Sequence, residues 1–245
     1  MKFKPRSLAC HGFSLVLLAV SCLAQDEEEV PDVNAPVKQL GGGALEVGGV
    51  RVDKSARTIS FPAAVNMNGG NIEYLLVAKG GKTHESLFVT DIKPYYIHLA
   101  MLLLGAKGNP RDPSLEKKGP PPSAIDRDYL KSAPELKGDE VTLFVKWKNG
   151  GQERMNDVAD FVINQEEKAP MRHGPWMYNG SMFYHGKFLA QLDGSIAAMV
   201  TDPEALINNR QPGHDNDTIW EVDPARTPAV NTPVTLTITL AEKHF

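Results

Sequence analysis

The side chains of this sequence that are most suited to bind a metal ion are His84 and Glu85, within Lys82–Ser86, and His98 further along the chain. Imidazole and carboxylate groups are common ligands of zinc and of other divalent metals. His84 and His98 would converge if a strand carrying the first packs on a helix carrying the second. Neighbouring residues of a strand point to opposite faces, so His84 and Glu85 would share one metal only at a β-bulge. The alternative is structural, with hydrogen bonds for His84 or Glu85 and a partly buried helix position for His98.

A second group of candidate residues is rich in aromatic side chains. It consists of His173, Trp176, Tyr178, Phe183, Tyr184, His185 and Phe188. Aromatic rings beside polar groups can form a binding platform for a sugar or a peptide, which makes Trp176, Tyr178 and His185 the candidate ligand-binding residues. Aromatic residues also fill the cores of β domains, so a structural role is the alternative.

A third candidate is a calcium site at Asp215 and Asp217, within Gly213–Thr218. Closely spaced carboxylate and amide oxygens suit calcium, but the glycine and glutamate of an EF-hand loop do not stand at their required offsets. The alternative is an Asx-rich turn. The Gly-Ser pairs at 180–181 and 194–195 lack the glycine-x-serine-x-glycine elbow of a serine hydrolase. The sequence therefore assigns no catalytic residue.

The first 24 residues have the features of a signal peptide: a basic start, an apolar core at residues 13–20, and small residues after it. The apolar stretch is shorter than the roughly 20 residues that a membrane-spanning helix needs. Two processing routes are open. One is cleavage after Ala24; the other is cleavage before Cys22 with a lipid on its sulfur, because Ala19–Cys22 resembles a bacterial lipoprotein box. We expect an exported protein of the periplasm or cell envelope that contacts a membrane only through a lipid on Cys22.

Composition narrows the classes of partner and cofactor. The formal net charge is −4, and loss of a leader with three positive and no negative charges would make it −7. Nucleic acid is bound mainly through Lys and Arg, so we do not expect this acidic protein to bind it. Both cysteines, Cys10 and Cys22, lie at the start of the chain. The rest of the chain therefore cannot form an internal disulfide, and it lacks the usual ligands of an iron–sulfur cluster.

Glycine and proline divide the chain into segments. Residues 25–43 are acidic at first and then contain Pro and Gly, which predicts a flexible tether. Residues 107–138 are rich in proline and predict a long surface loop. We expect residues 44–245 to form a single domain that includes this loop.

The pattern between these loops is mainly that of β-strands. Residues 140–148 alternate between apolar and polar side chains, and Asn149-Gly150 is a hairpin signal. Residues 94–105 begin with proline, end with glycine and are apolar nearly all round, which predicts a buried helix. A short helix is expected at Asp202–Leu206. Further strands are expected at residues 50–53, 57–61, 72–78, 86–90, 181–184, 187–191, 195–200 and 234–240, with residues 79–82 joining one strand pair. We expect a mainly β (α+β) fold, an antiparallel β-sheet or sandwich-like domain with one buried helix and one short helix.

A series of motifs, in order along the chain, carries a family resemblance. They are Gly81–Leu87, Leu102–Ala106, Gly174–Trp176, Asp193–Ala197, Thr201–Pro203 and Leu206–Asn209. With them the sequence resembles, over roughly residues 47–240, the YdjY domain of exported bacterial proteins and lipoproteins. The resemblance implies a secreted or lipid-attached domain and brings no assigned activity with it. A ferredoxin-like label has been attached to this family, but the domain region here contains no cysteine that could hold a cluster.

Two functions from different classes agree with these residues. The first is a non-enzymatic exported or lipid-anchored envelope domain that binds a ligand or a partner. The alternative is a metal-dependent enzyme that uses His84, Glu85 and His98. Convergence of these three side chains in an accessible pocket would favour the enzyme, whereas their separation would favour the binding module.

Overall fold

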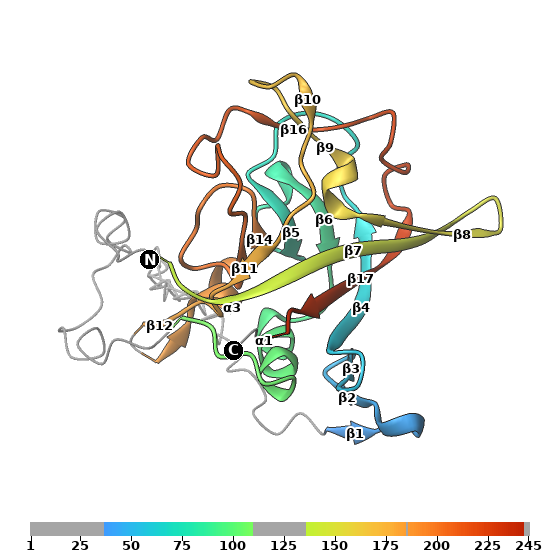
Figure 1. The fold of residues 1–245 in the computed structure, drawn as a ribbon, viewed down its shortest axis with the longest axis vertical. Coiled ribbons are helices and arrows are strands. Elements are labelled where there is room, and N and C mark those ends of the chain that lie inside the picture. Colours follow the sequence, from blue (N-terminus) through green and yellow to red (C-terminus); the bar gives the residue numbers. More distant parts are fainter. Residues whose placement is uncertain (1–36, 110–135, 185, 243–245) are drawn as a thin grey trace, which may run out of the picture. The chain divides into compact units, whose positions relative to one another are not determined.

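A computed structural model describes residues 37–109, 136–184 and 186–242 (Figure 1). The predicted signal peptide with Cys22, most of the tether, most of the proline-rich loop and His185 lie outside these ranges. The described residues are mainly β-strand, and their two α-helices are α1 (Pro94–Leu103) and α3 (Leu189–Asp193). The expected mainly β fold with one longer and one short helix is confirmed at this level.

Eight strands form a closed barrel. Their order is β4 (Thr58–Val65), β17 (Pro233–Leu240), β7 (Asp139–Asn149), β11 (Trp176–Tyr178), β15 (Ile207–Asn208), β14 (Ser195–Ala198), β5 (Tyr74–Ala78) and β6 (Ser86–Thr90). The last strand of this order, β6, pairs back to β4 through two residue pairs, Ala64 with Val89 and Val65 with Phe88. This second pairing of β4 closes the ring.

The closed barrel corrects the expected antiparallel sheet or sandwich. Two neighbouring pairs, β5 with β6 and β14 with β15, are parallel. Residues 79–82 do not form the turn of a hairpin, because the chain runs back through a 3-10 turn at Thr83–Glu85 before β6 begins. Ser86 consequently lies opposite Tyr74, so both strands start at the same end. A glycine pair between two apolar strands is a local hairpin signal, but here contacts with a distant segment, described below, determine the path.

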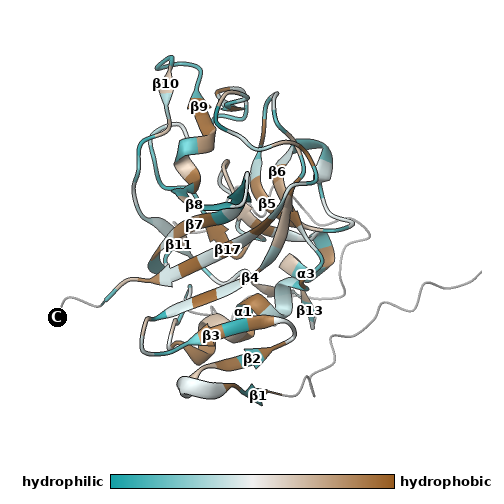
Figure 2. Ribbon diagram, turned by 90° about the vertical axis from the view of Figure 1, so that its right-hand side faces the viewer, coloured by the Kyte–Doolittle hydropathy of each residue, from teal (hydrophilic) through white to brown (hydrophobic). Residues whose placement is uncertain are grey.

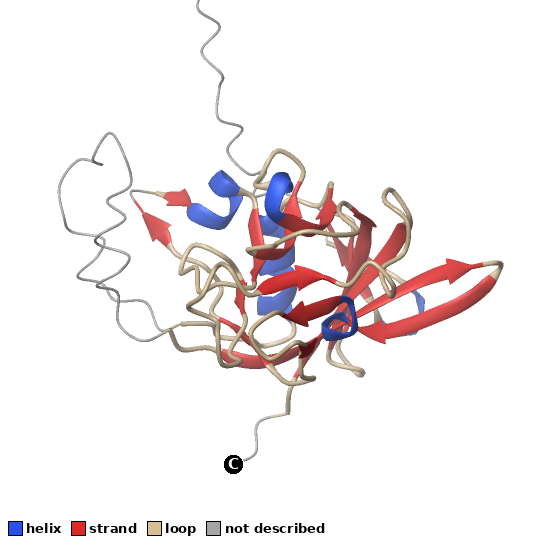
Figure 3. Ribbon diagram, turned by 90° about the horizontal axis from the view of Figure 1, so that it is seen from above, coloured by secondary structure: helices blue, strands red, loops and turns tan. Residues whose placement is uncertain are grey.

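The remaining strands extend or accompany the barrel. β1 (Lys38–Gln39), β2 (Leu45–Val47) and β3 (Val50–Asp53) continue the sheet beyond β4, so β1 lies in the segment expected to be a tether. β8 (Gln152–Asp157) pairs only with β7 in a hairpin that projects from the barrel (Figures 1 and 3), and the predicted turn at Asn149-Gly150 is confirmed. A small sheet contains β10 (Ala169–Pro170), β9 (Val162–Asn164) and β16 (Trp220–Val222), and a ribbon contains β12 (Phe183–Tyr184) and β13 (Lys187–Phe188).

Alternating side chains explain why β7 and β17 run through the barrel wall. The even-numbered apolar positions of β17, among them Leu236, are buried, whereas the residues between them are more exposed. Leu236 lies opposite Val145 of β7 on one side and Phe61 of β4 on the other. All three are buried, so inward-pointing residues of adjacent strands form one layer of the core.

The helix α1 fills one side of this core. It begins with Pro94, as predicted, and Gly105 follows its end with a positive φ of 90°. Ile97, Ala100 and Met101 are buried, and Figure 2 shows the helix beside β3 and β4. The predicted buried helix is confirmed. Within the described ranges, no helix is long and apolar enough to cross a membrane.

The short helix lies at α3 and not at the predicted Asp202–Leu206. Residues 203–206 form a turn in which Asp202 Oδ1 accepts a hydrogen bond from Glu204 N at 2.8 Å. The turn cannot continue as a helix because β15 begins at Ile207. Conversely, the strand expected over 187–191 stops at Phe188, after which the chain becomes helical. Both errors arise where an element is only a few residues long.

Candidate functional site

The three predicted metal ligands are not brought together. His84 and Glu85 lie in the 3-10 turn after β5, with His84 Nε2 and Glu85 Oε2 3.5 Å apart, and the His84 side chain is exposed. His98, on α1, places Nδ1 2.8 Å from the Tyr178 hydroxyl and packs its ring against Phe188. The described ranges contain no group of three His, Cys, Asp or Glu side chains that could hold a metal ion. The geometry therefore gives the metal-enzyme hypothesis no support.

The predicted aromatic platform lies in the core. Trp176 and Tyr178 belong to β11, in the barrel wall, and are 1% and 0% exposed. Burial raises the pKa of the Tyr178 hydroxyl far above its usual value, because the ionised form would be poorly solvated. Neither residue presents a surface to a sugar or peptide, and the third member, His185, lies outside the described ranges. Trp176 and Tyr178 are therefore core residues, which was the structural alternative to a binding platform.

The predicted calcium ligands Asp215 and Asp217 lie in an exposed loop. Between them, Asn216 Oδ1 accepts hydrogen bonds from the backbone N and the hydroxyl of Thr218, at 3.0 and 2.8 Å. This is an Asx turn, the alternative expected from the residue types. The loop is also fixed by Trp220 Nε1, which donates to Gly213 O at 3.1 Å.

A different group of residues meets where three of the sequence motifs converge. The loop of residues 79–85 contacts the turn Asp193-Gly194 so closely that a Cβ atom on Gly81 would lie 2.9 Å from Asp193 O. Gly194 has a positive φ of 71°, and a Cβ atom on it would lie 2.9 Å from Gly81 Cα. Only glycine fits both positions. The loop of residues 201–206 adjoins them through the side-chain contacts described next, and we call these three segments the motif face.

Lys82, Tyr74 and Asp202 form a chain of contacts across the motif face. Lys82 Nζ donates to the Tyr74 hydroxyl at 2.6 Å, and this hydroxyl donates to Asp202 Oδ2 at 2.9 Å. Lys82 Nζ also lies 4.7 Å from the centre of the Tyr74 ring. Tyr74 is buried, whereas Lys82 and Asp202 are partly exposed. These contacts therefore lead from the surface to the buried hydroxyl of Tyr74.

The carboxyl group of Glu204 is buried next to that of Asp193. Glu204 is buried, and burial raises its pKa to about 8, together with a hydrogen bond to Asp193 and the negative charges of Asp193 and Asp202. The ammonium group of Lys82 acts in the opposite direction. Glu204 therefore carries a proton at neutral pH and links the turn at Asp193 to the loop of residues 201–206.

Two buried asparagines fix the loop that carries Asp202 and Glu204. Asn208 Oδ1 accepts from Asp202 N at 2.7 Å, and its Nδ2 donates to Asp202 O at 2.9 Å and to Asn179 Oδ1 at 2.8 Å. Asn179 Nδ2 in turn donates to Ala205 O at 2.8 Å. These bonds fix the backbone of the loop on both sides of Glu204.

Ser195, the first residue of β14, lies beside the Tyr74 hydroxyl. It is fully buried, and its Oγ is the one buried side-chain nitrogen or oxygen of the described residues that makes no hydrogen bond of good geometry. Burial and the Asp202 carboxylate raise the pKa of Tyr74 well above its usual value, against a smaller lowering by the Ser195 hydroxyl. The Ser195 hydroxyl thus lies within reach of the Tyr74 hydroxyl but is not aligned with it for a hydrogen bond of good geometry.

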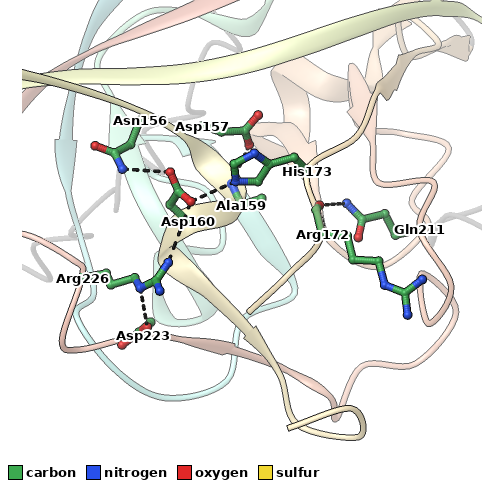
Figure 4. Close-up of polar contacts among 9 residues, drawn as sticks. All are labelled: Asn156, Asp157, Ala159, Asp160, Arg172, His173, Gln211, Asp223 and Arg226. Carbon is green, nitrogen blue, oxygen red and sulfur yellow. Dashed lines mark hydrogen bonds and ion pairs between the residues drawn. The ribbon is translucent and has the colours of Figure 1, made fainter. Parts of the chain in front are cut away.

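Figure 4 shows a second polar cluster, centred on Asp160. Asp160 accepts a hydrogen bond from Asn156 Nδ2 at 2.8 Å, and His173 Nε2 lies 2.9 Å from its Oδ1. Arg226 Nη1 lies 3.9 Å from the same oxygen. The hydrogen bond to Asp160 raises the pKa of His173 despite a small opposing effect of burial. Asp223 Oδ2 lies 3.6 Å from Arg226 Nε, so the cluster joins three separate segments at the surface through ion pairs.

Sequence reasoning passed over the residues of the motif face. Lys82, Asp193 and Asp202 stand inside the motifs that carry the family resemblance, but none received a role, and Tyr74 was only part of an apolar strand. The usable signal was that short polar motifs, separated along the chain, occur together in one family. Their meeting point depends on the parallel pairing of β5 and β6, which the sequence did not predict.

Comparison with protein families gives one result. The family model of the YdjY domain matches residues 50–239, which is most of the chain. No curated protein and no solved structure matches this sequence. Three of the motifs meet at the motif face within that matched region, and the chain belongs to the YdjY domain family.

Proposed function

We propose that this protein is an exported domain of the cell envelope that binds a ligand or a protein partner through the motif face. The observation that supports this proposal is that Lys82 and Asp202, from two of the family motifs, meet at the Tyr74 hydroxyl. A structural network could be built from buried groups alone. Here the charged side chains of Lys82 and Asp202 remain partly exposed, and Asn208 fixes the backbone of Asp202 through two hydrogen bonds.

A binding role agrees with the chemistry of this face better than catalysis does. The hydroxyl that could act as a nucleophile, Ser195 Oγ, is fully buried, and no histidine of the described residues forms a hydrogen bond with it. Lys82 and Asp202 supply hydrogen-bond donors and acceptors with both signs of charge, which is what recognition of a polar ligand requires.

Export is supported by the basic start, the short apolar core and the small residues of the leader. Mass spectrometry of the protein from its own cells tests this part of the proposal. We expect a mature chain that begins either after Ala24 or at a lipid-bearing Cys22. A mature protein that retains Met1 and the whole leader would contradict export.

Ligand screening by thermal unfolding tests the binding role. We expect one class of envelope compound to raise the melting temperature of the wild-type protein and to lose this effect in Lys82→Met and in Asp202→Asn. Glu153→Gln is the matched control, because Glu153 forms an exposed ion pair with Lys146 on the β7–β8 hairpin. The proposal fails if every stabilising compound acts equally on the face variants and the control, or if the protein turns its ligand over chemically.

A further inference from the structure

We propose that the motif face contains a binding site for a primary ammonium group of a ligand, and that Lys82 occupies this site in the structure as an internal substitute. The inference rests on the proposed binding function and names the chemical class of the ligand. It follows from the position of Lys82 Nζ, from the charges around it and from the unpaired hydroxyl behind it.

The position of Lys82 Nζ shows that the site accepts an ammonium group. The group lies 2.6 Å from the Tyr74 hydroxyl and 4.7 Å from the centre of the Tyr74 ring. An aromatic ring and a hydroxyl that hydrogen-bonds to a carboxylate, here Asp202, are groups that attract a cation. The same atoms would contact the ammonium group of a ligand.

The site has a surplus of negative charge. The negative charges of Asp193 and Asp202 raise the pKa of Glu204, and the positive charge of Lys82 lowers it. The pKa of Glu73 is also raised, by burial and by the negative charges of Glu85 and Asp217. The main cation that lowers it is again Lys82. One ammonium group thus opposes the negative charge of two sets of acidic residues, so binding of a cationic ligand is electrostatically favoured.

The buried hydroxyl of Ser195 is a second and independent sign of a ligand site. A buried polar atom without a hydrogen bond costs about 1 to 3 kcal/mol, so such atoms are rare in folded proteins. Ser195 Oγ lies beside the Tyr74 hydroxyl and has a free acceptor for an N–H group that arrives there. The described residues offer no group of three metal-binding side chains, which favours an organic cation over a metal ion.

Lys82 can leave the site without a change of fold. Its backbone is held by the close contact of Gly81 with Asp193 O, whereas its side chain is a long flexible chain that is already partly exposed. Rotation of this side chain would place Nζ in solvent and leave the ring and hydroxyl of Tyr74 to the ligand. A ligand would therefore bind the wild-type protein in competition with Lys82.

Chemical rescue of Lys82→Ala with butylammonium tests the inference. We expect the variant to melt below wild type, and butylammonium to restore much of the lost melting temperature. Calorimetry should show at least about tenfold tighter binding to the variant than to wild type, because wild type must first release Lys82. Butanol, at matched ionic strength, has the same shape without the charge and should not stabilise the variant.

Two further variants make the test specific. Lys82→Met fills the space of the lysine without its charge, so butylammonium should not rescue it. Lys146→Ala removes an ammonium group that pairs with Glu153 on the β7–β8 hairpin, away from any buried hydroxyl, and should also show no rescue. The inference is overturned if butylammonium stabilises Lys82→Ala no more than Lys146→Ala.

If Lys82→Ala does not fold, the comparison of wild type with Asp202→Asn decides. We expect weaker butylammonium binding to Asp202→Asn, and equal binding to both proteins overturns the inference. Failure of the inference is distinct from failure of the proposed function. A neutral or anionic ligand whose binding is lost in Asp202→Asn would remove the ammonium site and leave the binding function in place.

Discussion

At the scale of single residues, the motif face differs from the sites expected from the sequence in one respect: its chemistry comes from residue types that carry no metal or nucleophile signature. His84, Glu85 and His98 attracted attention as metal ligands, yet they do not converge. Lys82 and Asp202 are unremarkable in the sequence and meet only through Tyr74. Residue identity alone drew attention to His84 and Glu85 and not to the neighbouring Lys82, and these two residues lie in a 3-10 turn in place of the expected strand.

The raised pKa of Glu204 makes stability depend on pH. Its pKa is raised from 4.5 to about 8, so the folded protein keeps a proton that the unfolded chain releases. The contribution of Glu204 to stability therefore falls as pH rises from 4.5 to 8 and is constant above that range. Glutamine cannot ionise, so Glu204→Gln should show a flatter decline in urea unfolding across this window. Glu153→Gln, at an exposed position, should follow wild type, and parallel curves for wild type and Glu204→Gln would exclude the raised pKa of Glu204.

The contact between His173 and Asp160 should have a pH dependence of its own (Figure 4). The pKa of His173 is raised above 6.5, so its contribution to stability is fully present below pH 6.5 and is lost as pH rises through the folded pKa. His173→Ala should therefore destabilise the protein in mild acid and have little effect in alkali. We expect less than about 1 kcal/mol, since the side chain is exposed. A double-mutant cycle with Asp160→Asn measures it, and a coupling energy that is independent of pH would contradict the assignment.

At the scale of elements, the length of a segment decided whether its structure could be predicted. β7 and β17 are long enough to show alternation, and α1 is bounded by Pro94 and Gly105, so all three were found. β15 has two residues and β11 has three, which is too short to show any period. The parallel pairing of β5 with β6 was missed for another reason. It depends on the packing of Gly81 against Asp193-Gly194, a contact between segments far apart in the sequence.

This glycine contact gives a prediction with a close control. Gly194→Ala puts a side chain at a φ of 71° and 2.9 Å from Gly81 Cα, whereas Gly151→Ala meets a positive φ of 84° with nothing within 4 Å. The control should lose about 1 to 2 kcal/mol from backbone strain alone. Gly194→Ala should lose at least about 1 kcal/mol more, because the overlap must be relieved by movement of the chain. Equal losses in urea unfolding would show that the two loops are not tightly packed.

At the scale of the whole molecule, β17 joins parts of the chain that are distant in sequence. It pairs along most of its length with β4 on one side and β7 on the other. The mainly β class followed from the strand patterns, but closure of the barrel did not, because it depends on the pairing of β6 with β4 through only two residue pairs. Local periodicity carries no information about which edge strands meet.

Substitutions in β17 should therefore weaken the entire barrel. Leu236 is fully buried between Val145 and Phe61, so Leu236→Ala should cost roughly 2 to 5 kcal/mol. The adjacent Thr235 is exposed, and Thr235→Ala should change stability by less than about 1 kcal/mol. Urea unfolding followed by tryptophan fluorescence and by circular dichroism should give one coincident transition in both variants. Two separate transitions in Leu236→Ala would show that the barrel unfolds in independent parts.

The place of β17 also determines when the protein can fold. A ribosome makes β4 early and β17 last among the described strands, so β4 and β7 have no partner between them until residues 233–240 have left the exit tunnel. Contacts between segments so distant in sequence are formed slowly, since a long loop must close before they stabilise the chain. The barrel can therefore close only after residues 233–240 have been synthesised, and the strands made before them remain incompletely folded until then.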